Sequence, residues 1–210
     1  MRDRDAPLTA ADLDALAWDK MGGLVPAIVQ DAASGVVLML GYMDRAALEQ
    51  TLADGRATFF SRSKQRLWQK GESSGNHLAV RSVHVDCDGD ALLVRADPVG
   101  PTCHLGTVSC FGTGEARGPA WLATLERVVH ERATADPGES YTARLLAAGL
   151  PRIAQKVGEE GVEIALAAVT RDKDGVAEEI ADLLYHLTVL MRARELSWEE
   201  IVAVLRSRHT

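Results

Sequence analysis

The stretch DCDGDALLVRADPVGPTCHLGTVSC, residues 86–110, sets the organisation of this sequence. It holds all three cysteines of the 210-residue chain, together with a triplet of alternating aspartates and one histidine: Cys87, Cys103, Cys110, Asp86, Asp88, Asp90 and His104. Thiolates are soft ligands that select zinc, whereas carboxylates are hard ligands that select magnesium or calcium. The stretch therefore predicts either two different metal sites or one metal beside a charged substrate.

The residues at the start of this stretch have the pattern of a β-hairpin. Apolar and polar side chains alternate over residues 82–87, as in a half-buried strand, and a similar apolar run follows at 91–94. The Asp-Gly pair at 88–89 is a strong signal for the turn between them. Alternation places Cys87 on the face opposite the carboxylates on either side of it. The pattern therefore favours two neighbouring sites over one mixed set of ligands.

Each of these residues also has an ordinary explanation. An acidic hairpin tip is usually solvated, and an isolated cysteine is usually a small buried hydrophobe. Clustering of every cysteine beside the acid triplet favours a metal site instead, and the odd cysteine count argues against a disulfide framework. Three thiolates around a tetrahedral zinc leave one open position, as in catalytic sites. A water bound there has its pKa lowered to about 7 and supplies hydroxide at neutral pH.

Composition sets limits on the class of protein. Hydrophobic residues make up 47% and charged residues 25% of the chain, as in an ordinary globular protein of one large or two small domains. The net charge of -7 argues against nonspecific nucleic-acid binding, which needs a basic surface. No apolar run approaches the roughly 20 residues needed to span a bilayer, so no membrane partner is expected. The charged N-terminal residues lack a signal-peptide core, which predicts a cytoplasmic protein.

The first half of the chain reads as strands with few helices. Residues 11–20 have weak helical periodicity, 24–30 and 36–40 are expected strands around a turn, 44–54 is a helix capped by Asp44, and 57–61 is another strand.

Residues 61–76 differ in character, because basic side chains precede a small loop rich in hydroxyl, amide and glycine groups. Such a loop can hold phosphate oxygens, and in an acidic protein it suggests an anionic substrate. A mobile solvated loop is the alternative explanation. The candidate substrate-binding residues are Arg62, Lys64, Lys70, Ser73, Ser74 and Asn76. The Gly-Lys-Ser/Thr signature of a P-loop does not occur.

Helical signals replace strand signals after a Gly- and Pro-containing segment at 112–119. Expected helices begin at 121, cover 141–148, 151–171 and 176–194, and begin again after a capping box of Ser197 with Glu200.

Two of these helices carry acidic residues beside their apolar stripes. On the 151–171 helix the polar wedge contains Lys156, Glu159, Glu160 and Glu163, and on the next helix it contains Glu179, Asp182 and His186. A surface helix normally has one broad polar face, whereas acids close to a core repel one another and are costly to desolvate. Packed together, the helices would form a four-carboxylate nest suited to magnesium. A solvated acidic face is the alternative.

Both halves resemble known families. The Asp86–Asp90 triplet, the Cys103-His104 and Cys110-Phe111 pairs and WQKGESSGN at 68–76 resemble phosphoribosyl-AMP cyclohydrolase over about residues 18–115. The motif KVGEE at 156–160, Glu163, Glu179 and DLLYH at 182–186 are similar to phosphoribosyl-ATP pyrophosphohydrolase, an all-α pyrophosphatase, over about residues 121–208. Together they resemble the bifunctional histidine-biosynthesis family.

The resemblance implies an α+β organisation. Residues 1–17 form an N-terminal arm, 18–115 a mostly antiparallel β-sheet domain with a few helices, 116–120 a linker, and 121–210 an all-α helical bundle of the nucleotide pyrophosphatase type.

It also implies two consecutive hydrolyses. The second domain would cleave phosphoribosyl-ATP to phosphoribosyl-AMP and pyrophosphate, and the first would open the adenine ring at N1–C6. Zinc ligands are then the three cysteines, magnesium ligands the aspartate triplet and the helical carboxylates, and His104 a candidate for proton transfer. Arg144 and Lys156 are expected phosphate contacts. The family is dimeric with zinc ligands from both subunits, so a homodimer is expected.

Two other interpretations fit less well. A zinc nucleotide deaminase, fused to a housecleaning all-α nucleoside-triphosphate pyrophosphatase, would need His-x-Glu and Pro-Cys-x-x-Cys motifs, and neither occurs. A zinc-stabilised interaction module would use close cysteine pairs, whereas these cysteines are 16 and 7 residues apart.

Overall fold

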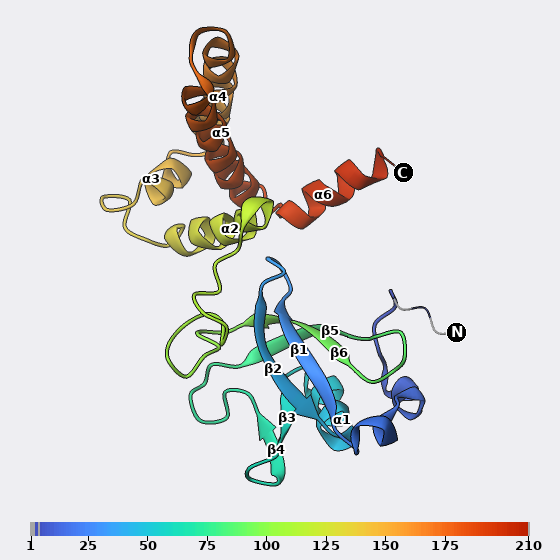
Figure 1. Cartoon of the computed structure of the whole chain (residues 1–210). Coiled ribbons are helices and arrows are strands. Elements are labelled where there is room, and N and C mark those ends of the chain that lie inside the picture. The colour runs from blue at the N-terminus through green and yellow to red at the C-terminus, as the bar shows by residue number, and fades with distance from the viewer. Residues whose placement is uncertain (1–2, 4, 210) are drawn as a thin grey trace. The chain divides into compact units, whose positions relative to one another are not determined.

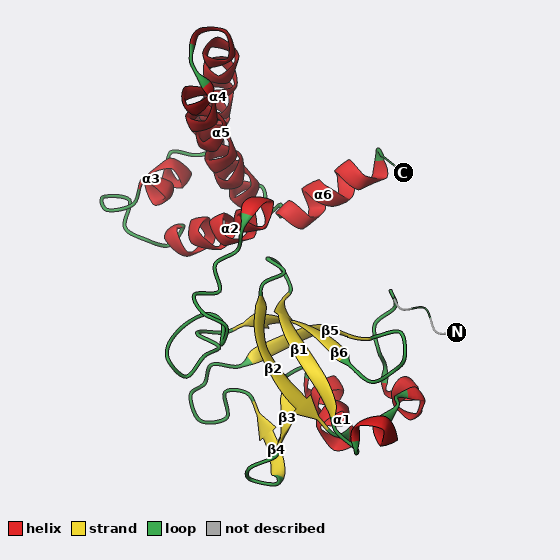
Figure 2. Ribbon diagram, viewed as in Figure 1, coloured by secondary structure: helices red, strands yellow, loops and turns green. Residues whose placement is uncertain are grey.

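The computed structural model describes residue 3 and residues 5–209. Residues 1, 2 and 4 of the expected N-terminal arm, and residue 210, lie outside the described residues. The chain divides into two compact units after Gly118. The first is built on β-strands and the second on α-helices, which confirms the α+β expectation (Figures 1 and 2).

A four-stranded mixed sheet forms the first unit, in the order β2-β1-β6-β5. Strands β1 and β6 are parallel, and the two outer pairs are antiparallel. A separate antiparallel pair, β3-β4, lies beside it. The bounds are β1 Val25–Asp31, β2 Val37–Met43, α1 Arg45–Asp54, β3 Thr58–Ser61, β4 Arg66–Gln69, β5 Leu78–Val85 and β6 Leu92–Pro98.

Alternating burial explains the central strands. Val25, Ala27 and Val29 of β1 are fully buried in the core of the unit. Helix α1 begins where the Asp44 side chain accepts a hydrogen bond of 2.7 Å from the backbone N of Ala47. Helix α1 therefore follows from a capping residue, whereas β1 was predicted from a short apolar run and its alternating burial arises from packing in the sheet.

The weak helical periodicity at residues 11–20 corresponds to two short 3₁₀ helices, Ala10–Ala15 and Trp18–Met21. Two other local expectations for this unit were wrong. The basic segment before the polar loop contains strand β4, in which Trp68 packs against Phe59 of β3 with ring centroids 5.8 Å apart. Strand β5 ends at Val85, so Cys87 lies in the connection to β6.

The second unit is helical. Its helices are α2 Trp121–Arg132, α3 Tyr141–Ala147, α4 Leu150–Thr170, α5 Lys173–Ala193 and α6 Trp198–Ser207. The two long helices, α4 and α5, pack side by side as a hairpin (Figure 2). A small core of Val129, Leu145, Ile153 and Val189 joins α2 and α3 to them.

Helix ends in this unit follow capping chemistry. Helix α5 begins three residues earlier than expected, because the Asp172 side chain caps it by accepting a 3.0 Å hydrogen bond from the backbone N of Gly175. The capping box of Ser197 and Glu200 is present at α6, as predicted. Within the described part of the chain, no helix is both long enough and apolar enough to cross a membrane.

Candidate active sites

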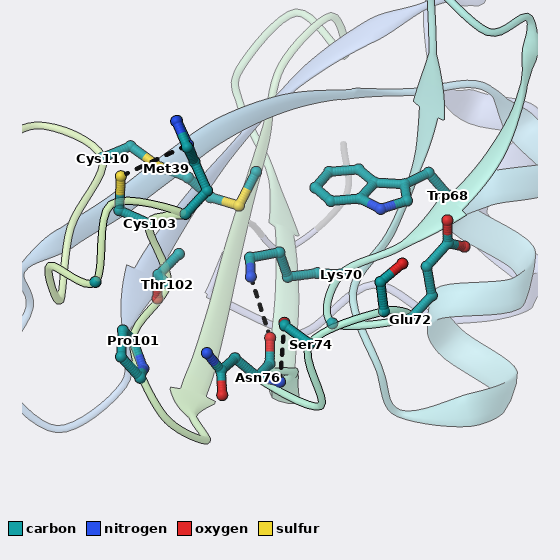
Figure 3. Close-up of a pocket in the computed structure, with 14 residues that line it drawn as sticks. Met39, Trp68, Lys70, Glu72, Ser74, Asn76, Pro101, Thr102, Cys103 and Cys110 are labelled. Carbon is teal, nitrogen blue, oxygen red and sulfur yellow. Dashed lines mark hydrogen bonds between the residues drawn. The ribbon is translucent and has the colours of Figure 1, made fainter.

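A cavity of about 450 Å³ lies in the first unit (Figure 3). It is lined by seven of the candidate residues, which come from the polar loop and from the cysteine segment: Lys70, Ser73, Ser74, Asn76, Cys103, His104 and Cys110. Met39 and Thr102 also line it and were missed, and Trp68, which begins the motif at residues 68–76, lines it as well. Among the described residues, the Thr102 hydroxyl is buried without a hydrogen-bond partner.

The polar loop is held in shape by its own backbone. Gly71 has φ 86°, and an added Cβ there would lie 2.6 Å from the carbonyl of Asn76. The buried Lys70 ammonium donates a hydrogen bond of 3.1 Å to that carbonyl (Figure 3). Burial lowers the pKa of Lys70, while the charges of the nearby Cys110 and Cys103 oppose that shift. A cation is thus held beside the thiols.

Cys103 and Cys110 are paired in the cavity wall. Hydrogen bonds from the Leu105 backbone and the Thr107 side chain lower the pKa of Cys103. Desolvation of the Cys110 sulfur and the charge of Cys103 raise the pKa of Cys110, although the residue as a whole is exposed. The ring nitrogen Nδ1 of His104 lies 4.0 Å from the Cys103 sulfur. Of these two thiols, Cys103 is therefore the one that ionises more readily.

The third cysteine lies elsewhere. Cys87 is exposed in the β5–β6 connection, and its sulfur is 4.0 Å from Oδ1 of Asp88. Among the described residues of this single chain, no group of three potential metal ligands includes a cysteine. One chain thus brings two thiols together and holds the third beside the aspartates.

Carboxylate oxygens of Asp86, Asp88 and Asp90 lie within 4.8 Å of one another. One oxygen of Asp86 accepts hydrogen bonds from the backbone N of three following residues, at 3.0, 3.0 and 3.2 Å, which shapes the turn. The Lys20 ammonium contacts Asp88 and lies 2.6 Å from Asp90, and it holds the pKa of Asp88 below its usual range. Lys20 thus pairs with this aspartate cluster, a contact that the sequence did not reveal.

Arg62 and Lys64 are placed outside the cavity lining. The Arg62 guanidinium lies 4.0 Å from the ring centroid of Tyr42, and Lys64 is exposed in the β3–β4 turn.

The helical unit brings acidic side chains of α4 and α5 together. Oxygens of Glu160, Glu179 and Asp182 lie within 4.8 Å of one another, and the two glutamates are buried. The charge of Glu160, followed by desolvation and the charge of Glu179, raises the pKa of the nearby Glu163. Such crowding of like charges calls for a cation, and hard oxygen donors fit magnesium.

Two basic side chains, Lys156 and Arg171, pair with carboxylates of this cluster, whereas Arg144 does not contact it in the described part of the chain. The Lys156 ammonium lies 2.9 Å from both Glu159 and Glu160, and it lowers the pKa of Glu159. Arg171, which sequence reasoning missed, forms an ion pair with Glu179 from the end of α4. Arg144 lies on α3 and reaches the backbone carbonyl of Pro137 at 3.4 Å.

The two units together have the features of a bifunctional metal-dependent hydrolase. Paired thiols in the wall of a cavity suit a soft cation, and clustered carboxylates, two of them buried, suit a hard one.

Sequence comparison agrees with this class. Family models match in both units: phosphoribosyl-AMP cyclohydrolase over residues 39–112 and phosphoribosyl-ATP pyrophosphohydrolase over residues 122–209. The histidine biosynthesis bifunctional protein HisIE of Salmonella typhimurium is 55% identical over 202 residues, covering 96% of this chain and 99% of that protein. Proteins of the same name are 55% identical in Escherichia coli K12 (96% and 99% covered) and 53% identical in Vibrio cholerae (93% and 94% covered). The chain belongs to this family of bifunctional histidine-biosynthesis enzymes, which join a cyclohydrolase to a pyrophosphohydrolase.

Proposed function

We propose that each unit performs one of two consecutive hydrolyses. The helical unit hydrolyses phosphoribosyl-ATP to phosphoribosyl-AMP and pyrophosphate, and the sheet unit then opens the adenine ring of phosphoribosyl-AMP at N1–C6. The observation that carries this proposal is the presence of two chemically different clusters, one in each unit: thiols beside a cavity and carboxylates between helices. The proposed domains are residues 18–115 and 121–210, joined by residues 116–120.

In the sheet unit, the polar loop binds the substrate and His104 moves the proton. Lys70, Ser73, Ser74 and Asn76 offer a cation, hydroxyls and an amide to phosphate oxygens at one side of the cavity. Zinc held by the three cysteines would supply a bound water of lowered pKa at neutral pH. His104 lines the same cavity beside Cys103, from where its imidazole can donate a proton to the departing ring nitrogen.

A homodimer accounts for the position of Cys87. Because Cys87 lies apart from the other two thiols of its own chain, we propose that it completes the zinc site of the partner subunit. The aspartate triplet next to it would hold magnesium, after displacement of the Lys20 ammonium. Arg62 and Lys64, outside the cavity lining, would contact the substrate from its open side.

In the helical unit, Glu159, Glu160, Glu163, Glu179 and Asp182 would hold magnesium, which neutralises phosphate charge when bound. Lys156 and Arg144 bind the phosphates, since both are cations on the helices that flank the carboxylate cluster. The partners are small nucleotides, not nucleic acid or membrane, and the compartment is the cytoplasm.

Incubation of the protein with phosphoribosyl-ATP tests this proposal, with pyrophosphate and the ring-opened product followed separately. Pyrophosphate should appear first and the ring-opened product second. Metal analysis should find about one zinc per chain. Pyrophosphate release without any ring opening, in zinc-replete protein, would contradict the assignment of the first unit.

A further inference from the structure

His186 lies on α5 and is 5% exposed. Its ring nitrogen Nδ1 lies 2.9 Å from the backbone carbonyl of Asp182, one turn earlier, and 3.3 Å from Oε1 of Glu160. Both neighbours of Nδ1 are acceptors, so in the neutral ring Nδ1 carries the hydrogen and Nε2 is left to accept. The imidazole is thereby fixed between the backbone of its own helix and a carboxylate of α4.

Two groups contact the same oxygen of Glu160. Oε1 lies 2.9 Å from the Lys156 ammonium and 3.3 Å from Nδ1 of His186, whose hydrogen bond goes to the Asp182 carbonyl. Glu160 is only 3% exposed, so little water competes with these contacts. Contacts from two directions at one oxygen restrict the plane of the carboxylate, as groups that orient a metal ligand do.

The other ring nitrogen of His186, Nε2, links the imidazole beside Glu160 to helix α3. Nε2 lies 3.2 Å from the hydroxyl of Tyr141, the first residue of α3. The neighbouring residues of the two helices are also hydrogen-bonded: the Thr142 hydroxyl lies 2.7 Å from the Tyr185 hydroxyl. Two adjacent side chains of α3 are therefore hydrogen-bonded to two adjacent side chains of α5. Helix α3 also carries Arg144, whose guanidinium lies 5.5 Å from the Tyr141 ring centroid.

We propose that His186 is the positioning residue of the carboxylate cluster. It holds Glu160 in the orientation that binds magnesium, and through Tyr141 it connects that orientation to the docking of α3. Substrate phosphates bound by α3 are then held at a fixed position relative to the cation bound by α4 and α5. This inference rests on the proposed metal role of Glu160, and it adds a residue that does not itself touch the metal.

Two polar substitutions of His186 test the contacts of its two ring nitrogens separately. His186→Asn places an amide nitrogen near the position of Nδ1 and keeps a donor toward Glu160. His186→Gln reaches the position of Nε2 and keeps a contact with Tyr141, but it loses the donor toward Glu160. Binding of Mg²⁺ to the full-length protein is measured by calorimetry without substrate, and Glu160→Gln identifies the binding event that belongs to the carboxylate cluster.

We expect His186→Gln to weaken that event by roughly 10- to 100-fold, the usual effect of losing a residue that orients a ligand, and His186→Asn to stay near the parent. Equal affinities in the two variants, whether parental or weakened, would overturn the inference. Tyr141→Phe provides a second measurement: it should raise KM for phosphoribosyl-ATP more than it lowers kcat, and an unchanged KM would overturn the link to α3. Parental binding in Glu160→Gln would instead contradict the proposed metal site itself.

Discussion

The ammonium of Lys156 lies 2.9 Å from Oε1 of Glu160, one helical turn away on α4, and the Lys156 side chain is only 19% exposed. This ammonium therefore helps to neutralise the buried carboxylate and to stabilise the metal-free protein, in addition to the phosphate-binding role proposed for Lys156.

Replacement of Lys156 by Met should show both effects. Loss of the charged hydrogen bond should destabilise the metal-free protein by about 1–3 kcal/mol in urea unfolding, and saturating Mg²⁺ should restore part of that loss. Pyrophosphate release should fall by roughly 10²-fold, because the substitution removes the cation that is proposed to contact the substrate phosphates. Lys173→Met, at the exposed start of α5, is the matched control and should change neither quantity. A parental rate in Lys156→Met would exclude Lys156 from the site.

The glycines of the polar loop offer a matched pair of substitutions. Gly71 and Gly75 both have positive φ, 86° and 78°, so alanine strains either position by about 1–2 kcal/mol. Only at Gly71 would the new Cβ collide with the Asn76 backbone, since nothing lies within 4 Å at Gly75. Gly71→Ala should therefore sharply reduce ring opening, while Gly75→Ala should reduce it little, with pyrophosphate release parental in both. Equal losses of ring opening would mean that the Lys70–Asn76 contact does not shape the site.

The pair formed by Arg66 and Glu72 should make loop stability depend on pH. The guanidinium lies 2.6 Å from Glu72, and its hydrogen bond lowers the pKa of Glu72 below the ordinary 4.5. A lowered pKa stabilises the fold above pH 4.5, and this contribution is lost as pH falls through the folded-state pKa. In Arg66→Met the pKa of Glu72 should rise toward its ordinary value, which an NMR titration of the Glu72 carboxyl carbon measures. The same pKa in parent and variant would mean that the ion pair does not persist in solution.

Sequence reasoning predicted elements where local chemistry is sufficient. A short apolar run before a turn marks β1, and Asp44 marks the start of α1. Strand β4 was missed because its four residues include only Leu67 and Trp68 as apolar side chains, and its pairing with β3 depends on packing against Phe59. Local composition cannot supply that contact.

The candidate sites show the same limit. The Glu160, Glu179 and Asp182 cluster could be predicted, because i, i+3 spacing places acids at the edge of a helix stripe. The pairing of Lys20 with Asp88 joins residues 68 positions apart, and only the folded chain reveals it. Likewise, the clustering of the cysteines predicted three thiolate ligands but could not show that Cys87 lies apart from the other two.

The most direct measurement of the central claim uses two single substitutions in the same assay. Cys103→Ser and Glu160→Gln proteins are each incubated with phosphoribosyl-ATP, and separately with phosphoribosyl-AMP, while pyrophosphate and the ring-opened product are quantified. We expect Cys103→Ser to release pyrophosphate at the parental rate without ring opening, and Glu160→Gln to open the ring of phosphoribosyl-AMP but release no pyrophosphate. Loss of both activities in either folded variant, or parental pyrophosphate release in Glu160→Gln, would contradict this expectation.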